Sequence, residues 1–161
     1  MIKKIILSLA LVASMANADT FSKGNKNFGV VLGAGTSYGD NYTILGLSGD
    51  YFVIDNLSVG LGYRGWFGSG PNINQVTVAS SYFIPLNKKF HPYVGAFVRE
   101  TFTDDKDNYE SYGARAGVAM NMSPNSYVSL GYAYEEYSEC TEGRFTECSN
   151  SYPEVVFSLS F

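Results

Sequence analysis

The final segment of the chain alternates between apolar and small or polar residues and ends on an aromatic ring. One face of this segment carries Val155, Phe157, Leu159 and Phe161, and the other carries Glu154, Val156, Ser158 and Ser160. A period of two residues is that of a β-strand, in which successive side chains point to opposite faces. The chain must therefore end in a strand with one continuous apolar face, and that face has to be covered by protein or by lipid.

The same alternation recurs along the whole chain and predicts eight strands. They span about 26–36, 42–54, 57–67, 73–84, 92–103, 109–122 and 127–136, followed by the final segment to Phe161. Turn-forming residues such as Asp55-Asn56 and Ser123-Pro124-Asn125 separate several of them. The second, fourth and sixth connections are short, whereas the fifth and seventh are longer and more acidic. This pattern is typical of bacterial outer-membrane barrels, which have short turns on the periplasmic side and longer loops on the outside.

The composition indicates which face of the strands meets lipid. Charged residues make up 16% of the chain, against about 25% in an ordinary soluble domain. Apart from Lys26, at the start of the first predicted strand, no lysine lies inside a predicted strand. The face opposite the apolar one consists mainly of Gly, Ser and Ala. A polar interior with an apolar exterior predicts an all-β fold, an eight-stranded antiparallel transmembrane β-barrel.

The first residues have the pattern of an export signal. Lys3 and Lys4 precede an apolar run, and Ala16-Asn17-Ala18 supplies the small residues that signal peptidase recognises. We expect residues 1–18 to be a signal peptide and residues 19–161 to be the barrel domain. No later stretch approaches the roughly 18 to 20 apolar residues that a transmembrane helix requires.

An internal repeat supports the arrangement of the strands in hairpins. Residues 45–53 align with residues 76–84, and both segments carry a Tyr-Phe pair shortly before a turn, Tyr51-Phe52 and Tyr82-Phe83. Aromatic side chains at this height are typical of the girdle at a membrane interface. We expect both pairs to belong to that girdle.

Four short motifs resemble the small outer-membrane barrel family typified by OmpX and by the membrane domain of OmpA. They lie at residues 51–61, 92–96, 112–117 and 157–161. The resemblance implies that the outer-membrane insertion machinery assembles the protein and reads a C-terminal signal formed by Phe157, Leu159 and Phe161. Members of this family serve as anchors, as adhesion or defence proteins, and sometimes as narrow channels.

Six charged residues project into the predicted lumen. They are Asp50, Arg64, Arg99, Arg115, Glu135 and Glu154. Because an unpaired charge is costly in a narrow barrel, we expect the three arginines to pair with the three carboxylates. The network is interpreted as a structural plug, and the alternative is a gate whose rearrangement admits ions. The phase of the strand at 92–103 stays open by one residue, which decides whether Arg99 or Glu100 faces inward.

The two cysteines of the chain, Cys140 and Cys148, fall in the last predicted loop. An exported chain with two cysteines indicates one disulfide, which would restrain the loop tip at 141–147. The bond is interpreted as a loop staple, and the alternative is a rigid loop that displays a surface to a partner.

Other motifs carry no catalytic prediction. The sequence Gly60-Leu-Gly-Tyr-Arg-Gly65 matches a dinucleotide fingerprint, but it lies inside a strand pattern, whereas the fingerprint requires a strand followed by a helix. The sole histidine, His91, lies at a predicted periplasmic turn, where we expect an ordinary interface residue and no base for a serine nucleophile. We therefore expect no enzymatic activity, no cofactor and no specific metal site.

The charge of the chain bears on its partners. The net charge is −4 at pH 7, which argues against nucleic acid, and the external loops are acidic. The expected partners are outer-membrane lipid, lipopolysaccharide reached through bridging divalent ions, the assembly machinery and an extracellular partner of the loops. The predicted function is that of a monomeric, non-enzymatic outer-membrane protein with a structural or surface-interaction role, and the alternative is a narrow channel for small ions or solutes.

Overall fold

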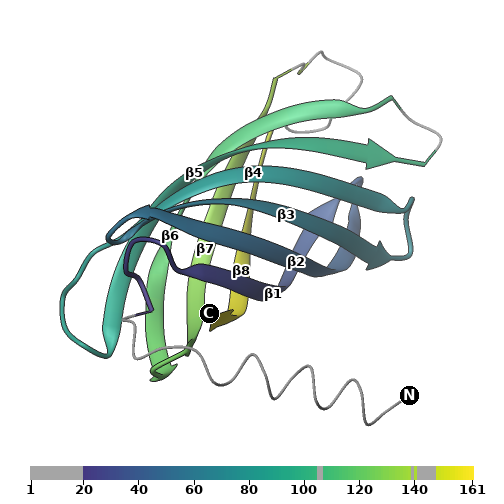
Figure 1. Ribbon diagram of the computed structural model, residues 1–161. Helices are drawn as coiled ribbons and strands as arrows, with labels where there is room; N and C mark the ends of the chain where they lie inside the picture. Colours follow the sequence, from purple (N-terminus) through teal and green to yellow (C-terminus); the bar gives the residue numbers. More distant parts are fainter. Residues whose placement is uncertain (1–19, 105–106, 139, 141–147) are drawn as a thin grey trace, which may run out of the picture.

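The computed structural model describes residues 20–104, 107–138, 140 and 148–161. These residues form eight antiparallel strands that follow one another around a closed barrel (Figure 1). The strands are β1 (Lys26–Ser37), β2 (Asp40–Ile54), β3 (Leu57–Gly68), β4 (Ile73–Phe83), β5 (Phe90–Thr103), β6 (Tyr109–Ser123), β7 (Ser126–Tyr137) and β8 (Ser149–Ser160). The predicted fold and strand ranges are confirmed. β2 and β5 each begin two residues earlier than predicted, and β8 begins at Ser149, before the alternation described from Glu154.

The barrel closes where β1 pairs with β8. The register of this pair runs from Asn27 opposite Ser160 to Gly33 opposite Glu154. Every strand therefore has a hydrogen-bonded neighbour on both sides, and the sheet has no open edge. The end at which β1 begins and β8 finishes is called the termini end, and the opposite end is called the loop end. Among the described residues, no helix is long and apolar enough to cross a membrane.

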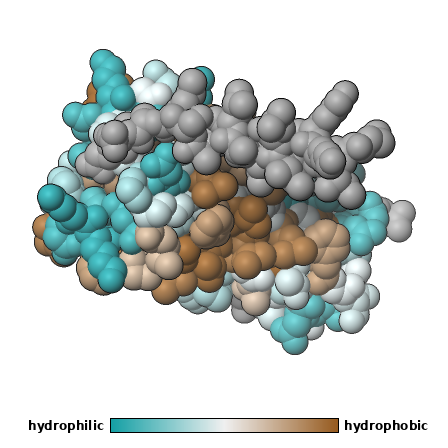
Figure 2. All heavy atoms as spheres, turned by 60° about the horizontal axis from the view of Figure 1, so that its bottom comes forward, coloured by the Kyte–Doolittle hydropathy of each residue, from teal (hydrophilic) through white to brown (hydrophobic). Residues whose placement is uncertain are grey.

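The outer face of the barrel is apolar around its middle. Leu61 is 64% exposed and Leu130 is 59% exposed, and on the visible face apolar side chains gather in a band between more hydrophilic ends (Figure 2). Large apolar side chains that point away from the interior on all eight strands are what a bilayer requires of a barrel. The chain thus has the outer face of a transmembrane protein.

The interior is filled by two aromatic clusters and by charged residues that pack against them. The cluster at the termini end consists of Phe21, Phe52, Phe83, Tyr93, Ala119 and Tyr127, and it is called the lower cluster. The cluster toward the loop end includes Tyr42, Ile44, Trp66, Ile73, Phe97 and Tyr152, and it is called the upper cluster. Eight strands leave an interior that side chains can fill, as the sequence predicted.

The prediction for the two Tyr-Phe pairs is half wrong. Tyr51 and Tyr82 face outward and are more than 40% exposed, but Phe52 and Phe83 face inward and are buried. The cause is the period of two, since adjacent residues of a strand cannot share a face. His91, expected at the membrane interface, is also buried and lies against the lower cluster, with its ring centroid 4.4 Å from that of Phe21.

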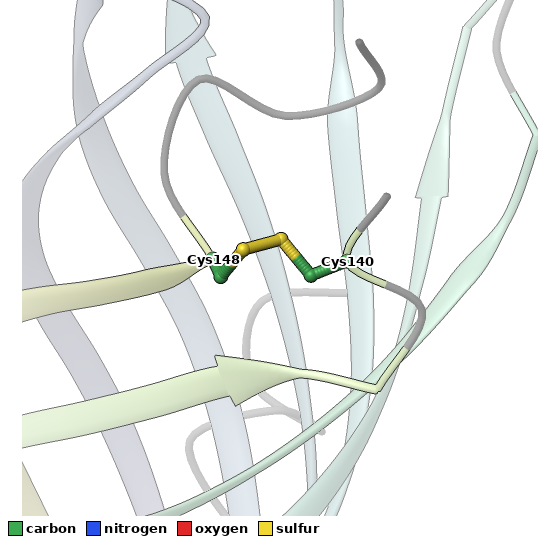
Figure 3. The surroundings of a disulfide bond; sticks show 2 residues. All are labelled: Cys140 and Cys148. Atoms are coloured by element: carbon green, nitrogen blue, oxygen red, sulfur yellow. A yellow bond between two sulfur atoms is a disulfide. The ribbon is translucent and has the colours of Figure 1, made fainter. Parts of the chain in front are cut away.

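A disulfide joins Cys140 and Cys148, which follow β7 and precede β8 (Figure 3). Their Cα atoms lie 5.4 Å apart, within the normal range for the bond. The residues between them, including the loop tip at 141–147, lie outside the described residues, as does the predicted signal peptide, which stays a prediction.

The disulfide makes the thiols unreactive until it is reduced. We expect no alkylation of Cys140 or Cys148 in folded protein extracted without reductant, and two alkyl groups per chain after reduction, by intact mass. Reduction should lower the free energy of unfolding by about 2 to 3 kcal/mol, since the bond closes a short loop. Alkylation before reduction would contradict the bond.

Candidate functional site in the barrel lumen

The charged residues of the lumen form a buried cluster. The Arg64 Nη2 atom lies 2.8 Å from Glu154 Oε2, and Arg99 forms an ion pair with Glu135. Arg115 Nη1 lies 3.6 Å from Glu154 Oε1. Because the side chains of Arg64, Arg99, Glu135 and Glu154 are all at most 4% exposed, these charges are largely removed from solvent and depend on one another.

Tyr152 joins the two ion pairs. Its hydroxyl oxygen accepts hydrogen bonds from Arg99 Nη1 at 2.5 Å and from Arg64 Nη1 at 3.3 Å. Arg99 also donates from Nε to Thr77 Oγ1 at 2.9 Å, and its guanidinium lies 4.5 Å from the centre of the Phe97 ring. The sequence reasoning missed Tyr152, although extending the alternation of the last strand by two residues before Glu154 would have placed it inward.

The pairing of charges differs from the predicted three-to-three arrangement. Glu154 accepts both Arg64 and Arg115, while within the described part of the chain Asp50 has no cationic nitrogen within 4 Å. Asp50 instead lines a cavity together with Arg115. The open phase of β5 is resolved, because Arg99 faces the lumen and is 3% exposed.

Glycines on neighbouring strands make room for the arginines. A Cβ atom at Gly46 would lie 2.7 Å from Arg64 Cγ and 2.6 Å from the carbonyl oxygen of Tyr63. A Cβ atom at Gly95 would lie 3.3 Å from Arg115 Cγ. The inward glycines therefore provide space that the long cationic side chains occupy.

A cavity of about 50 Å³, with charged, hydroxyl and aromatic groups in its lining, lies between the charged cluster and the lower cluster. Its lining includes Asp50, Arg115, Glu154, Ser58 and Ser129, with the rings of Phe83, Tyr93 and Tyr127 at the termini end. By volume it has room for about three or four water molecules. Arg115 Nε and Glu154 Oε1 are buried with no protein hydrogen-bond partner among the described residues, so water is the natural occupant.

The glycine motif of β3 lacks the strand-to-helix setting that a dinucleotide site requires. The residues from Gly60 to Gly65 lie within β3, and β3 leads through residues 69–72 to another strand. No group of three or more His, Cys, Asp or Glu side chains is positioned for a metal ion in the described ranges. The assembly signal predicted at the C-terminus faces the lipid side, where Phe157, Leu159 and Phe161 are each about half-exposed.

Tyrosine and acidic side chains occupy the outer face near the loop end. The hydroxyl groups of Tyr112 and Tyr134 donate to Glu136 at 3.1 Å and 2.8 Å. On the adjacent pair of strands, Glu100 lies directly opposite Glu110. Rings with polar tips are typical of the level of lipid headgroups, so we expect the loop-end boundary of the membrane at this height.

Known structures share this fold. The N-terminal β-barrel domain of OprF from Pseudomonas aeruginosa aligns with a TM-score of 0.68 at 14% identity, over 86% of this chain and 98% of that chain. Neisserial surface protein A (NspA) aligns with a TM-score of 0.63 at 16% identity, over 85% and 96%. OprG from Pseudomonas aeruginosa gives 0.59 at 14% identity, over 90% and 99%. No protein-family model and no curated protein matches the sequence.

The closed barrel, its apolar outer face and these structural matches define the class of protein. The chain has the fold of the small eight-stranded outer-membrane β-barrels, and this fold indicates the outer membrane as its location. At 14% to 16% identity, the matches establish the architecture, and function has to be argued from the lumen and the surface.

Proposed function

We propose that the protein is a non-enzymatic, monomeric integral protein of the outer membrane with a structural or surface-interaction role. The filled lumen carries this proposal. Two ion pairs, Tyr152 and the aromatic clusters occupy the cross-section of the barrel, and the cavity between them is about 50 Å³. Ions or solutes would need a continuous polar route through the lumen. Packed aromatic rings interrupt such a route at both ends.

The surface supports an interaction role. The loop end carries the disulfide and the acidic and tyrosine side chains described above. One protein of the same fold, Neisserial surface protein A, is named for its position at the cell surface. We infer that the loops of this chain reach lipopolysaccharide, with divalent ions between the acidic groups, or an extracellular partner, and that the outer-membrane assembly machinery inserts the barrel.

Single-channel recording tests the proposal. We expect no discrete current steps from the refolded barrel, with Cys140 and Cys148 oxidised, in a planar bilayer, because the lumen is packed. Folding is checked separately by the heat-dependent shift of the barrel on a gel. Reproducible steps from folded protein would contradict a closed structural barrel.

A narrow channel is the second candidate, and Arg115 favours it. Its side chain is 15% exposed and 3.6 Å from Glu154, so it is held less firmly than Arg64, and it lines the cavity beside Asp50. Movement of this side chain would widen the charged layer while the Arg64 and Arg99 pairs stay in place.

The substitution Arg115→Ala tests this candidate. We expect it to lower the free energy of unfolding by about 1 kcal/mol, since the pair is long and partly solvated. If Arg115 is a gate, current steps should appear in the variant and not in Lys89→Ala, which removes an exposed cation at the termini end. If the Arg115→Ala barrel folds and gives no current steps, Arg115 is not a gate.

A further inference from the structure

The residues before β1 fold back into the termini end of the barrel. Thr20 and Phe21 are each 1% exposed, although they precede the first strand and belong to no sheet. The segment at 20–25 is called the N-terminal plug. The proposed function does not use it, and an apolar side chain from a connecting segment is rarely buried so completely unless it fills a defined space.

The ring of Phe21 lies at the centre of the lower cluster. Its centroid is 4.6 Å from that of Phe83, 5.1 Å from Tyr127, 4.4 Å from His91 and 5.9 Å from Phe52. These four rings come from β4, β7, β5 and β2. One side chain thus packs against four strands that are spread around the barrel.

Hydrogen bonds to two turns fix the plug. Asn56 N, between β2 and β3, donates to Phe21 O at 2.7 Å, and Thr20 Oγ1 donates to Pro124 O, between β6 and β7, at 3.0 Å. Lys23 N donates to Asp55 Oδ1 at 2.8 Å. The segment therefore crosses the mouth of the barrel from one turn to another.

Phe21 also supports the floor of the lumen cavity. Phe83 and Tyr127 line that cavity, and both rings pack against Phe21. Without the Phe21 ring, the two floor rings would lose a neighbour on the side that faces the termini end. Side chains that lose a packing partner gain freedom to move.

We propose that the N-terminal plug is a second seal of the barrel, separate from the charged cluster, and that Phe21 closes the lumen cavity toward the termini end. The plug consists of a connecting segment held by one buried ring and a few hydrogen bonds. Strands held on both sides by neighbours open less readily than such a segment. The plug can therefore leave the mouth while the barrel stays intact, which would admit water and small solutes to the cavity.

A cysteine in the cavity tests this seal. Ser58 is 1% exposed and lines the cavity, so Ser58→Cys provides a reporter thiol, and the native cysteines are held in the disulfide. The probe is a small cationic methanethiosulfonate, and the readout is the labelling rate of the folded barrel by mass. We expect the reporter to be protected with Phe21 present and to react at least about ten-fold faster with Phe21→Ala.

The matched control is Phe28→Ala, which makes the same change on the lipid face of β1, where Phe28 is 45% exposed. It should leave the labelling rate unchanged. Equal rates in folded Phe21→Ala and in the parent would overturn the proposal, as would an equal increase with Phe28→Ala.

Amide hydrogen exchange of the unsubstituted protein provides a test that does not depend on whether the Phe21 variant folds. The amide proton of Asn56, which bonds Phe21 O, and that of Gly24, which bonds Phe52 O at 2.8 Å, should exchange with solvent more slowly than an exposed turn amide. Exchange at the unprotected rate in the intact barrel would mean that the plug is not docked, and the proposal would fail.

Discussion

Replacing Glu154 by Gln is expected to lower the free energy of unfolding by about 3 to 5 kcal/mol. The substitution keeps the size of the side chain and removes its charge. Arg64 is 4% exposed and lies 2.8 Å from Glu154, which also pairs with Arg115. In the variant, both arginines would lose the Glu154 carboxylate as a partner. A buried cation left without its partner loses the Coulomb attraction and keeps the cost of burial, which explains the magnitude.

Denaturant unfolding of the barrel in lipid vesicles would measure this loss, with fluorescence of the sole tryptophan, the buried Trp66, as the signal. The control is Glu136→Gln, which makes the same chemical change on the outer face. Glu136 accepts two tyrosine hydroxyls in a solvated setting, so its loss should be less than about 1 kcal/mol. Equal losses for the two variants would show that the lumen cluster contributes no more than a surface charge.

Replacing Leu61 by Arg should also destabilise the barrel strongly, by about 2 to 4 kcal/mol in a bilayer. Leu61 is 64% exposed and lies between Val59 and Tyr63 on the outer face of β3, near the middle of the apolar band. An arginine there would have to reach the headgroups or draw water into the hydrocarbon layer. The same unfolding assay in vesicles measures the effect.

The control places the same charge at a different depth in the membrane. Ile54 is 53% exposed and ends β2 at the termini end, so Ile54→Arg places the same charge at the rim, where we expect a loss of at most about 1 kcal/mol. A residue exposed to water would tolerate arginine at either height. Similar small losses at both positions would contradict a lipid-facing outer surface.

The amino-acid sequence is sufficient to predict the strands and, except in β5, the faces it assigns. The alternation of small or polar residues with large apolar residues marks these faces, because lipid and lumen impose opposite demands on neighbouring side chains. In β5 the phase stayed open, since large side chains such as Tyr93 and Phe97 occupy the inner face. This alternation alone is enough to place Arg64, Arg115, Glu135 and Glu154 on the inner face of the barrel, where all four side chains lie.

Alternation within a strand does not predict which residues of different strands lie at the same height in the barrel. Pairing of Glu154 with both Arg64 and Arg115 depends on the register and tilt of strands that are distant in sequence, and alternation within one strand carries no information on either. The N-terminal plug was missed for a related reason, since Phe21 stands outside any period. Phe52 and Phe83 could have been placed inward by extending each alternation from Tyr51 and Tyr82.

The pairing of β1 with β8 has a consequence for how the protein is made. Asn27 lies opposite Ser160, so β1 cannot pair with β8 until the whole chain has been synthesised. Every earlier intermediate has two strand edges whose backbone groups lack hydrogen-bond partners. In lipid such edges are costly, and in water they invite aggregation. A chain that lacks β8 would keep both open edges, so we expect proteases to degrade it before it inserts into the membrane.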